Sequence, residues 1–564
     1  MKHIKKYILS SLLVTSMLTS CEDFLTREPL DAPAQGTFLK NEAAVNNALN
    51  ALYRSMTWDF GLIPYQTGTD GWTDIAILRA NDLGEGVYDT YNSHPASLWK
   101  SIYTSIQRSN TILEEMESYK SNLSSASYER LKAEVRVLRA WSYHYLVFMF
   151  GDAPLITKTL KPEEFKTQVR TSKADIIKFI YDELDASADH LSWTPTERGR
   201  VSRSVALGLK ARTALYNKEF DLAKTTAKAV IDNAGLALNP NYGDLFTRSG
   251  QKPNAGGEIM YEVIYTDQEA TSRTNLPLGN ASRTAGGQSG RFPIQRLVDN
   301  FEASDGRRID ESTVYDPQNP RKNRDIRLKY TVALPGDTVN MNLLTFVYDI
   351  YNTSTRAFTN NAWVDRTNTD YDNAFGPAKS GVGYLWSKYT MTDENAFNSK
   401  VSFIFMRYAE ILLIYAEAAI ESNTVDNLAI ESINKLRARA KLPNIRSEVA
   451  SSTLEMRKLI RRERTSELAV EGFRWFDIRR WDIGAIAMPG IVVGISKTAT
   501  NLPAVPNFKK SADHDLNSIP DYSNQLSSRY VRETRYWTDK LNLLPIPQGE
   551  IDINPSLTQN PGWD

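Results

Sequence analysis

Apolar residues recur at intervals of three and four positions over several long segments, which is the pattern of amphipathic helices. These segments are residues 43–55, 97–119, 128–150 and 173–188. Each predicted helix carries one apolar face that has to pack against another element. The first half of the chain is therefore predicted to be largely helical.

Two further stretches each predict a pair of shorter helices. In the first, residues 204–233, small residues such as Ala206 and Ala223 lie on both sides of a turn near residues 217–219, and the aromatic Phe220 follows the turn. The second pair covers residues 407–440. Small residues where two helices cross resemble tetratricopeptide units. We therefore expect a mainly α fold, in which tetratricopeptide-like helix pairs form a solenoid-like scaffold.

Two segments lack this periodicity. Residues 57–95 and 254–400 are rich in Gly, Asn, Asp, Thr and Pro, and one helix is predicted in the second of them, near residues 293–301. Long ordered loops in a compact protein are usually functional. These two segments are the predicted functional side of the molecule.

The first 20 residues read as a secretory signal peptide. Lys2, Lys5 and Lys6 precede a short apolar run, and residues 18–21 (LTSC) resemble the bacterial lipobox at every position. Cys21 is the only cysteine, so no disulfide can form, and acylation at Cys21 would anchor the chain firmly. Residues 21–40 are predicted to be an acylated tether. Glu22 and Asp23 resemble the export signal of Bacteroidetes surface lipoproteins.

Ordered blocks along the whole mature chain resemble the SusD/RagB family of outer-membrane nutrient-binding lipoproteins. The blocks are residues 20–25 (SCEDFL), 99–110 (WKSIYTSIQRSN), 138–155 (LRAWSYHYLVFMFGDAPL), 199–220 (GRVSRSVALGLKARTALYNKEF), 297–308 (LVDNFEASDGRR), 323–328 (NRDIRL), 405–419 (FMRYAEILLIYAEAA), 459–481 (LIRRERTSELAVEGFRWFDIRRW) and 543–563 (LLPIPQGEIDINPSLTQNPGW). The number and order of these blocks make the resemblance specific.

The resemblance implies one SusD-like body over residues 41–564. Its parts would be a helical N-terminal part, 41–250, a helical C-terminal part, 401–564, and a large irregular, loop-rich ligand-binding side built by the insertions 57–95 and 254–400. The protein would be lipid-anchored in the outer membrane and face the cell exterior. It would bind a nutrient and deliver it to a SusC-like TonB-dependent transporter without cleaving it.

The net charge of the mature chain argues against nucleic acid as a partner. Removal of the signal peptide leaves 64 basic residues against 67 acidic ones. A nearly neutral, slightly acidic chain has no electrostatic footprint for nucleic acid. Four histidines remain after cleavage, and none has the spacing of a metal or base motif, so we expect no metal and no cofactor.

Three glutamates at intervals of four residues would lie on one row of a predicted helix. They are Glu463, Glu467 and Glu471. A glycosidase carboxylate pair is one interpretation of this row. We favour a structural ion network, because carboxylates at this spacing repel one another and arginines stand close in the sequence. The proposed partners are Arg437, Arg439 and Arg464.

Aromatic residues outside the helices are the candidate ligand contacts. A sugar ring stacks its C–H face on an aromatic plane, and its hydroxyls bind Asp, Asn and Arg. The first candidate cluster comprises Trp72, Asp70, Tyr88, Tyr91 and Asn92, and the second comprises Trp363, Arg366 and Tyr351. By contrast, Trp99, Trp141, Trp475 and Trp481 lie on predicted helices, and we expect them in the core.

The residues favour a glycan as the ligand only mildly. A peptide is the alternative within the same family. A helical-repeat adaptor of the outer membrane, with no nutrient ligand, is the alternative from another class. The aromatic-rich middle segment argues against such an adaptor, because a scaffold has no need of loops of this composition.

Overall fold

The computed structural model describes residues 41–58, 63–254, 257–267, 272–372, 374, 376–508 and 519–563. The predicted signal peptide, Cys21 and the tether lie outside the described residues. Within the described ranges, no helix is both long enough and apolar enough to cross a membrane.

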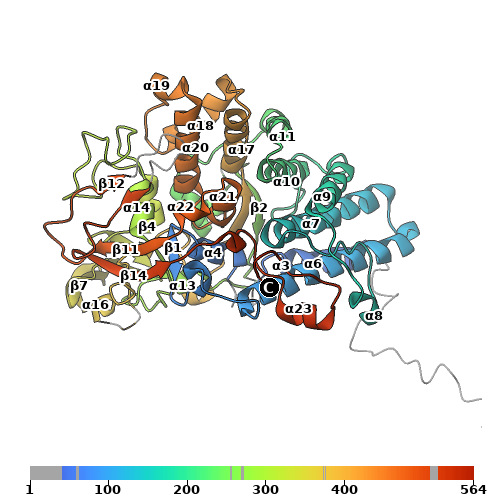
Figure 1. Ribbon diagram of the computed structural model, residues 1–564, viewed down its shortest axis with the longest axis horizontal. Helices are drawn as coiled ribbons and strands as arrows, with labels where there is room; N and C mark the ends of the chain where they lie inside the picture. Colours follow the sequence, from blue (N-terminus) through green and yellow to red (C-terminus); the bar gives the residue numbers. More distant parts are fainter. Residues whose placement is uncertain are drawn as a thin grey trace, which may run out of the picture.

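The predicted mainly helical fold is confirmed, and its helices gather on one side of the molecule (Figure 1). The long helices are α3 (Glu42–Ser55), α6 (Ser93–Ser118), α7 (Ser125–Phe150), α9 (Lys173–Ala188), α10 (Arg203–Tyr216), α11 (Phe220–Asn233), α17 (Tyr408–Glu421), α18 (Asn427–Arg439), α20 (Thr453–Leu468) and α21 (Arg474–Arg480). Successive helices pack as pairs, among them α6 with α7, α10 with α11 and α17 with α18. Both predicted short pairs, including the turn near residues 217–219, are present.

The starts of these helices follow from side-chain capping. Ser124, Ser172, Ser202 and Asp426 precede α7, α9, α10 and α18, and each accepts a hydrogen bond from a backbone N–H of the first turn. Such a cap satisfies a donor that has no partner within the helix, and it contributes about 1 kcal/mol.

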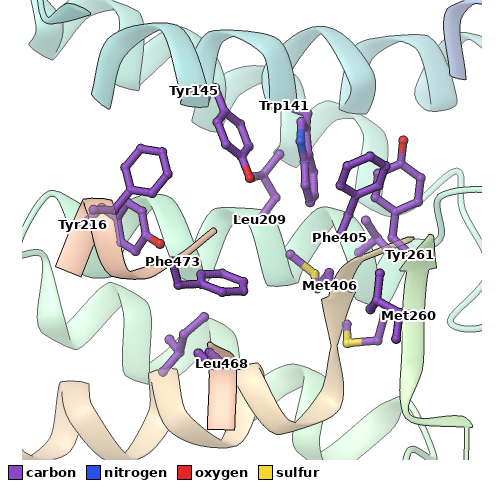
Figure 2. Packing of buried hydrophobic residues seen from close by; sticks show 14 of the residues in the cluster. Trp141, Tyr145, Leu209, Tyr216, Met260, Tyr261, Phe405, Met406, Leu468 and Phe473 are labelled. Atoms are coloured by element: carbon purple, nitrogen blue, oxygen red, sulfur yellow. The ribbon is translucent and has the colours of Figure 1, made fainter. Parts of the chain in front are cut away.

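The main core lies where α7 and α10 meet a two-stranded ribbon (Figure 2). The ribbon pairs β2 (Ile259–Val263) with β10 (Phe403–Arg407). Trp141 of α7 packs edge-on against Tyr261 of the ribbon, with ring centroids 5.1 Å apart. Gly208 of α10 permits this approach, since a Cβ there would lie 2.5 Å from the sulfur of Met406. The ribbon therefore ties the two helical halves together.

The middle of the chain is more regular than predicted. A four-stranded antiparallel sheet joins β5 (Thr338–Met341), β6 (Leu344–Val347), β7 (Ser354–Thr359) and β8 (Ala362–Thr367) in sequence order. The expectation of irregular structure is wrong for these residues. β7 alternates exposed and buried residues, as an amphipathic strand does. Its buried positions hold only Thr355 and Ala357, which are not strongly apolar, so the alternation is not visible in the sequence.

The remaining elements are short and lie mainly on the side opposite the long helices (Figure 1). Strands are β1 (Ala76–Leu78) with β3 (Arg291–Pro293), β4 (Val332–Ala333) with β9 (Leu385–Trp386), β11 (Gly490–Ser496) with β14 (Arg529–Arg535), and β12 (Asn507–Phe508) with β13 (Pro520–Asp521). Short helices are α4 (Tyr65–Thr69), α5 (Asp82–Glu85), α8 (Pro162–Phe165), α12 (Arg248–Gln251), α13 (Leu276–Asn280), α14 (Gln295–Asn300), α15 (Arg327–Thr331), α16 (Thr369–Asp372), α19 (Ser447–Ala450), α22 (Gly484–Ala487) and α23 (Gln548–Ile553). Helix α14 is the one predicted near residues 293–301.

Candidate functional site

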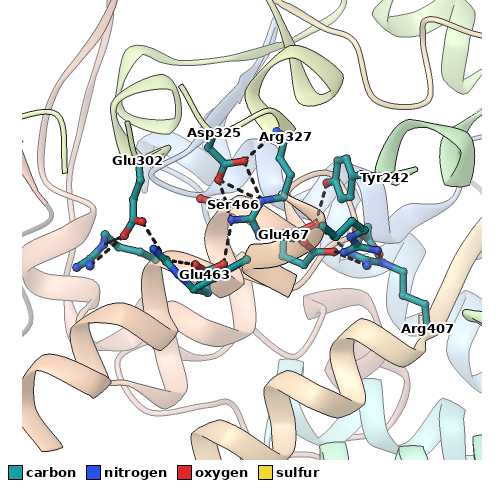
Figure 3. Close-up of polar contacts among 12 residues, drawn as sticks. Tyr242, Glu302, Asp325, Arg327, Arg407, Glu463, Ser466 and Glu467 are labelled. Carbon is teal, nitrogen blue, oxygen red and sulfur yellow. Dashed lines mark hydrogen bonds and ion pairs between the residues drawn. The ribbon is translucent and has the colours of Figure 1, made fainter. Parts of the chain in front are cut away.

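The glutamate row is buried among cations contributed by distant segments (Figure 3). Arg327 of α15 donates to Glu463 at 2.9 Å and to Glu467 at 3.0 Å. Arg407, at the end of β10, donates to Glu467 at 2.6 Å and to Glu471 at 2.8 Å. Lys388 completes the row with a 2.6 Å bond to Glu471. Each glutamate of the row is therefore paired.

Two details of the predicted network require correction. Arg437 and Arg439 do bind Glu463 and Glu467. Arg464, however, points away from the row and binds both carboxylate oxygens of Asp477 at 3.0 Å. Helix α20 ends at Leu468, so Glu471, the last glutamate of the row, lies beyond the helix and not on its face as predicted. Arg464 is next to Glu463 in sequence, and successive residues of a helix do not share a face.

The electrostatics of the row do not suit acid catalysis. Burial by itself raises the pKa of Glu467, but the guanidinium groups of Arg439, Arg407 and Arg327 outweigh it and hold the pKa well below its ordinary value. The pKa of Glu463 is lowered against burial in the same way by Arg327 and Arg437. A glycosidase acid needs a raised pKa to keep its proton. The row joins α20 to its neighbours and offers no such proton.

The first candidate cluster is mostly core. Trp72 is 4% exposed, and its ring packs edge-on against Tyr65 and His94 at centroid distances of 5.4 and 5.9 Å. Asp70 is 1% exposed and accepts a 2.6 Å hydrogen bond from the backbone N–H of Val470. No face of Trp72 is free to stack on a ligand. The expectation that Trp72 and Asp70 contact a ligand is therefore wrong.

The rest of that cluster holds a helix start. The side chain of Asn92 caps α6 by accepting from the backbone N–H of His94 at 3.0 Å, and its amide donates to Asp82. Tyr88 is half-buried with its ring 4.9 Å from that of Trp563. Tyr91 is 72% exposed, so within this cluster it alone presents an open ring.

The second cluster contains an exposed aromatic pair. Trp363 of β8 is 38% exposed, and it lies directly across the hairpin from Phe358 of β7, which is 42% exposed. Their ring centroids are 5.6 Å apart. Arg356 and Asp365 form the next cross-strand pair on the same face, and the Arg356 guanidinium lies 5.8 Å from the Trp363 ring. We call Arg356, Phe358, Trp363 and Asp365 the hairpin face.

The hairpin face has a local origin in the sequence. Asn360 and Asn361, between the two strands, have φ angles of 52° and 59°, the type I′ geometry that matches the twist of a hairpin. This turn sets the register that places Phe358 opposite Trp363. Sequence reasoning missed Phe358, and the Asn-Asn pair was the signal that could have revealed the hairpin and with it this residue.

The other two members of the second cluster lie elsewhere. Arg366 is three residues from Trp363 on one strand, so it points to the opposite face of the sheet. Tyr351 precedes β7, at the opposite end of that strand from the turn, and its hydroxyl donates to the backbone carbonyl of Ser496 at 3.0 Å. Tyr351 lines a separate cavity of about 110 Å³ together with Tyr315 and Tyr384.

Metal coordination has no candidate in the described ranges, where no group of three His, Cys, Asp or Glu side chains could hold an ion. The arrangement on the hairpin face is chemically simple. Two rings offer an apolar surface, and a guanidinium and a carboxylate beside them offer hydrogen bonds to hydroxyl groups.

Comparison with known proteins agrees with this architecture. The chain matches the model of the SusD family over residues 258–563 and a model described as "Starch-binding associating with outer membrane" over residues 23–215. SusD-like protein P25 of Formosa agariphila is 24% identical, with 96% of this chain and 95% of that protein covered.

Solved structures share the fold. A SusD-like carbohydrate binding protein of Bacteroides fragilis is 25% identical and superposes with a TM-score of 0.77, covering 93% of this chain and all of that one. A second SusD-like protein of the same organism is 23% identical, with a TM-score of 0.76, and covers 95% of this chain and all of that one. The chain belongs to the SusD family.

Proposed function

We propose that this protein is a lipid-anchored, outward-facing component of the outer membrane that binds an oligosaccharide or polysaccharide and delivers it to a SusC-like TonB-dependent transporter. It binds its ligand without cleaving it. Family membership, and the carbohydrate binding named for the Bacteroides fragilis relative, support the ligand class. The anchor would be acyl chains on Cys21.

The hairpin face is the observation that carries the proposal. Large aromatic side chains usually lie inside a protein, and two adjacent exposed rings form an apolar patch that a ligand can cover. Trp363 and Phe358 are exposed, and the charged side chains of Arg356 and Asp365 lie beside them on the same face. Aromatic planes with charged hydrogen-bonding neighbours suit the two faces of a sugar, its C–H bonds and its hydroxyl groups.

Calorimetric titration of the purified protein tests the ligand class. The panel should contain laminarin, soluble starch, xylan and pectin, with casein peptides as the alternative ligand. Binding of at least one polysaccharide and of no peptide is expected. Binding of peptides alone would show the peptide alternative to be correct. Binding of neither class would contradict the proposal and favour the adaptor alternative.

The anchor is tested separately. Cys21→Ala removes the only thiol, so labelling of cells with a clickable fatty acid should mark the wild-type protein and leave the variant unmarked. Label retained by the variant would contradict the anchor without affecting the ligand class.

A further inference from the structure

A cavity of about 470 Å³ adjoins the Tyr351 cavity, with which it shares Arg321 and Leu334, and no residue of the hairpin face lines it. Its walls come from two short stretches of chain and from four further side chains. The lining residues are Arg321, 324–326, Leu328 and Lys329, then Leu334 and 337–339 at the start of β5, and Ser304, Ser387, Met391 and Lys441. This volume lies within the range of about 300 to 1,000 Å³ that small-molecule sites occupy. It is large enough for a sugar unit.

Positive charge predominates in the lining. Arg321, Arg324, Lys329 and Lys441 face two acids, Asp325 and Asp337. The carboxylate of Asp325 is already matched, because Arg327, which is outside the lining, binds both of its oxygens at 3.1 and 2.7 Å. One acid therefore opposes four cations.

Asp337 neutralises only part of that charge. Burial raises the pKa of Asp337, against hydrogen bonding from the backbone N–H of Leu334 and the charges of Arg321 and Lys329. Its nearest recorded cation is Arg321, at 3.6 Å. In the part of the chain that the structure describes, neither Lys329 nor Lys441 has a carboxylate within ion-pair distance, and both side chains are exposed.

Two lining residues carry buried polar atoms that bond to nothing in the described chain. One is the hydroxyl of Ser387, a residue that is 3% exposed. The other is Nε of Arg324, whose terminal nitrogens donate to the backbone carbonyls of Pro320 and Phe301 at 2.9 Å. Unpaired buried donors cost free energy, which a ligand acceptor recovers where a small movement of the wall uncovers them. Both residues line the same cavity as Lys329 and Lys441.

We infer that this cavity binds an oxyanion carried by a sugar unit, a carboxylate or a sulfate ester. The inference rests on the proposed function and narrows its substrate class to an acidic glycan. Lysines supply mobile charge, and the fixed Arg324 and Ser387 supply directed donors. The wall is rigid, because Arg327 ties Asp325 to Glu463 of α20 (Figure 3).

The test compares charge variants on defined tetrasaccharides. Wild-type protein and a Lys329→Gln, Lys441→Gln double variant are titrated with tetragalacturonate, with a sulfated carrageenan tetrasaccharide and with neutral maltotetraose, at low and high NaCl. Lys322→Gln with Lys435→Gln is the matched control, because both lysines are exposed and neither lines the cavity. Ser387→Ala removes a hydroxyl that has no partner in the described chain.

Wild-type protein should bind one of the two acidic tetrasaccharides, and more weakly at high salt. The double variant should lose about tenfold or more in affinity, whereas the control should not. Ser387→Ala should weaken the same binding without lowering the melting temperature. Binding of tetragalacturonate would identify the oxyanion as a carboxylate, and binding of the carrageenan tetrasaccharide would identify it as a sulfate ester.

Two results would overturn the inference and leave the proposed function standing. One is acidic binding that the double variant leaves unchanged. The other is wild-type protein that binds maltotetraose or a neutral polysaccharide and neither acidic probe. Absence of binding to every saccharide, in this test and in the wider panel, would remove the proposed function as well.

Discussion

Two regions that lack long helices and have similar composition differ in how far they are buried. Residues 63–92 hold Trp72 and the sheet β5–β8 holds Trp363, and both tryptophans stand among tyrosine, aspartate and arginine in the sequence. Trp72 is 4% exposed and Trp363 is 38% exposed. An irregular sequence pattern thus marks the absence of a long helix, and it does not distinguish a buried segment from a binding surface.

Sequence-distant contacts account for the difference. Asp70 accepts hydrogen bonds from the backbone N–H groups of Val470 and Gly472, just beyond the end of α20. Asp74 likewise binds Arg474 at 2.7 Å through both oxygens. The first region therefore packs on the end of the glutamate row. The hairpin of β7 and β8 depends on its own turn, and it leaves one face of β7 and all of β8 exposed to solvent.

The largest loss of stability is expected in the glutamate row, on whose end the first region packs. Glu467→Ala leaves Arg327, Arg407 and Arg439 buried with one carboxylate fewer, and we predict a loss of about 5 kcal/mol in the free energy of unfolding. Chemical denaturation measures it. Glu431→Ala, exposed on α18, is the control and should change stability by less than about 0.5 kcal/mol. Equal stability of the two variants would show that the row does not hold the body together.

Trp72→Ala tests the burial itself. Removing a ring packed on Tyr65 and His94 leaves a core cavity, and we predict a loss of about 4 kcal/mol. Denaturant titration with a ligand titration alongside separates the outcomes. A variant with native stability and no glycan binding would show that Trp72 contacts the ligand and is not a core residue.

The pH dependence of Asp70 is a third test of the buried region. Burial raises the pKa of Asp70 to about 7 from an ordinary value of 3.8, against bonds from Val470 and Gly472. The folded protein therefore keeps a proton that the unfolded chain loses, and the stability this contributes declines as pH rises from about 4 to 7. We predict that the stability of the wild type relative to Asp70→Asn falls by about 4 kcal/mol across this window.

The control for this comparison is Asp221→Asn, an exposed residue of α11. The wild type, Asp70→Asn and Asp221→Asn are unfolded in parallel between pH 4 and pH 8. A difference between wild type and Asp70→Asn that is flat with pH would mean that Asp70 titrates as an exposed carboxylate does.

The smallest stability change is expected on the hairpin face. Trp363→Ala removes one cross-strand aromatic contact from an exposed strand, which costs about 1 kcal/mol at most. A thermal melt of the variant beside the wild type measures it. A loss as large as that of Trp72→Ala would make Trp363 a packing residue and abolish the contrast between the two regions.

The helices could be predicted because a helix cap and an apolar face each depend on residues close together in the sequence, as at Ser124 and Ser202. Helical position also placed Trp99, Trp141, Trp475 and Trp481 in the core, where the structure has them. Long-range pairing could not be foreseen. Arg327 and Arg407 stand 140 and 60 positions from Glu467, and no local rule connects them. The sheet β5–β8 was not predicted, because Thr355 and Ala357 are weak signals of a buried strand face.

Titration of the wild type, Trp363→Ala and Val364→Ala with the polysaccharide that the panel identifies tests the central claim, that the hairpin face contacts the glycan. Val364 is exposed on the same strand but on the opposite face, so it controls for damage to the hairpin. Loss of a stacking ring predicts about tenfold weaker binding for Trp363→Ala, with Val364→Ala unchanged. Wild-type affinity in Trp363→Ala would contradict the account.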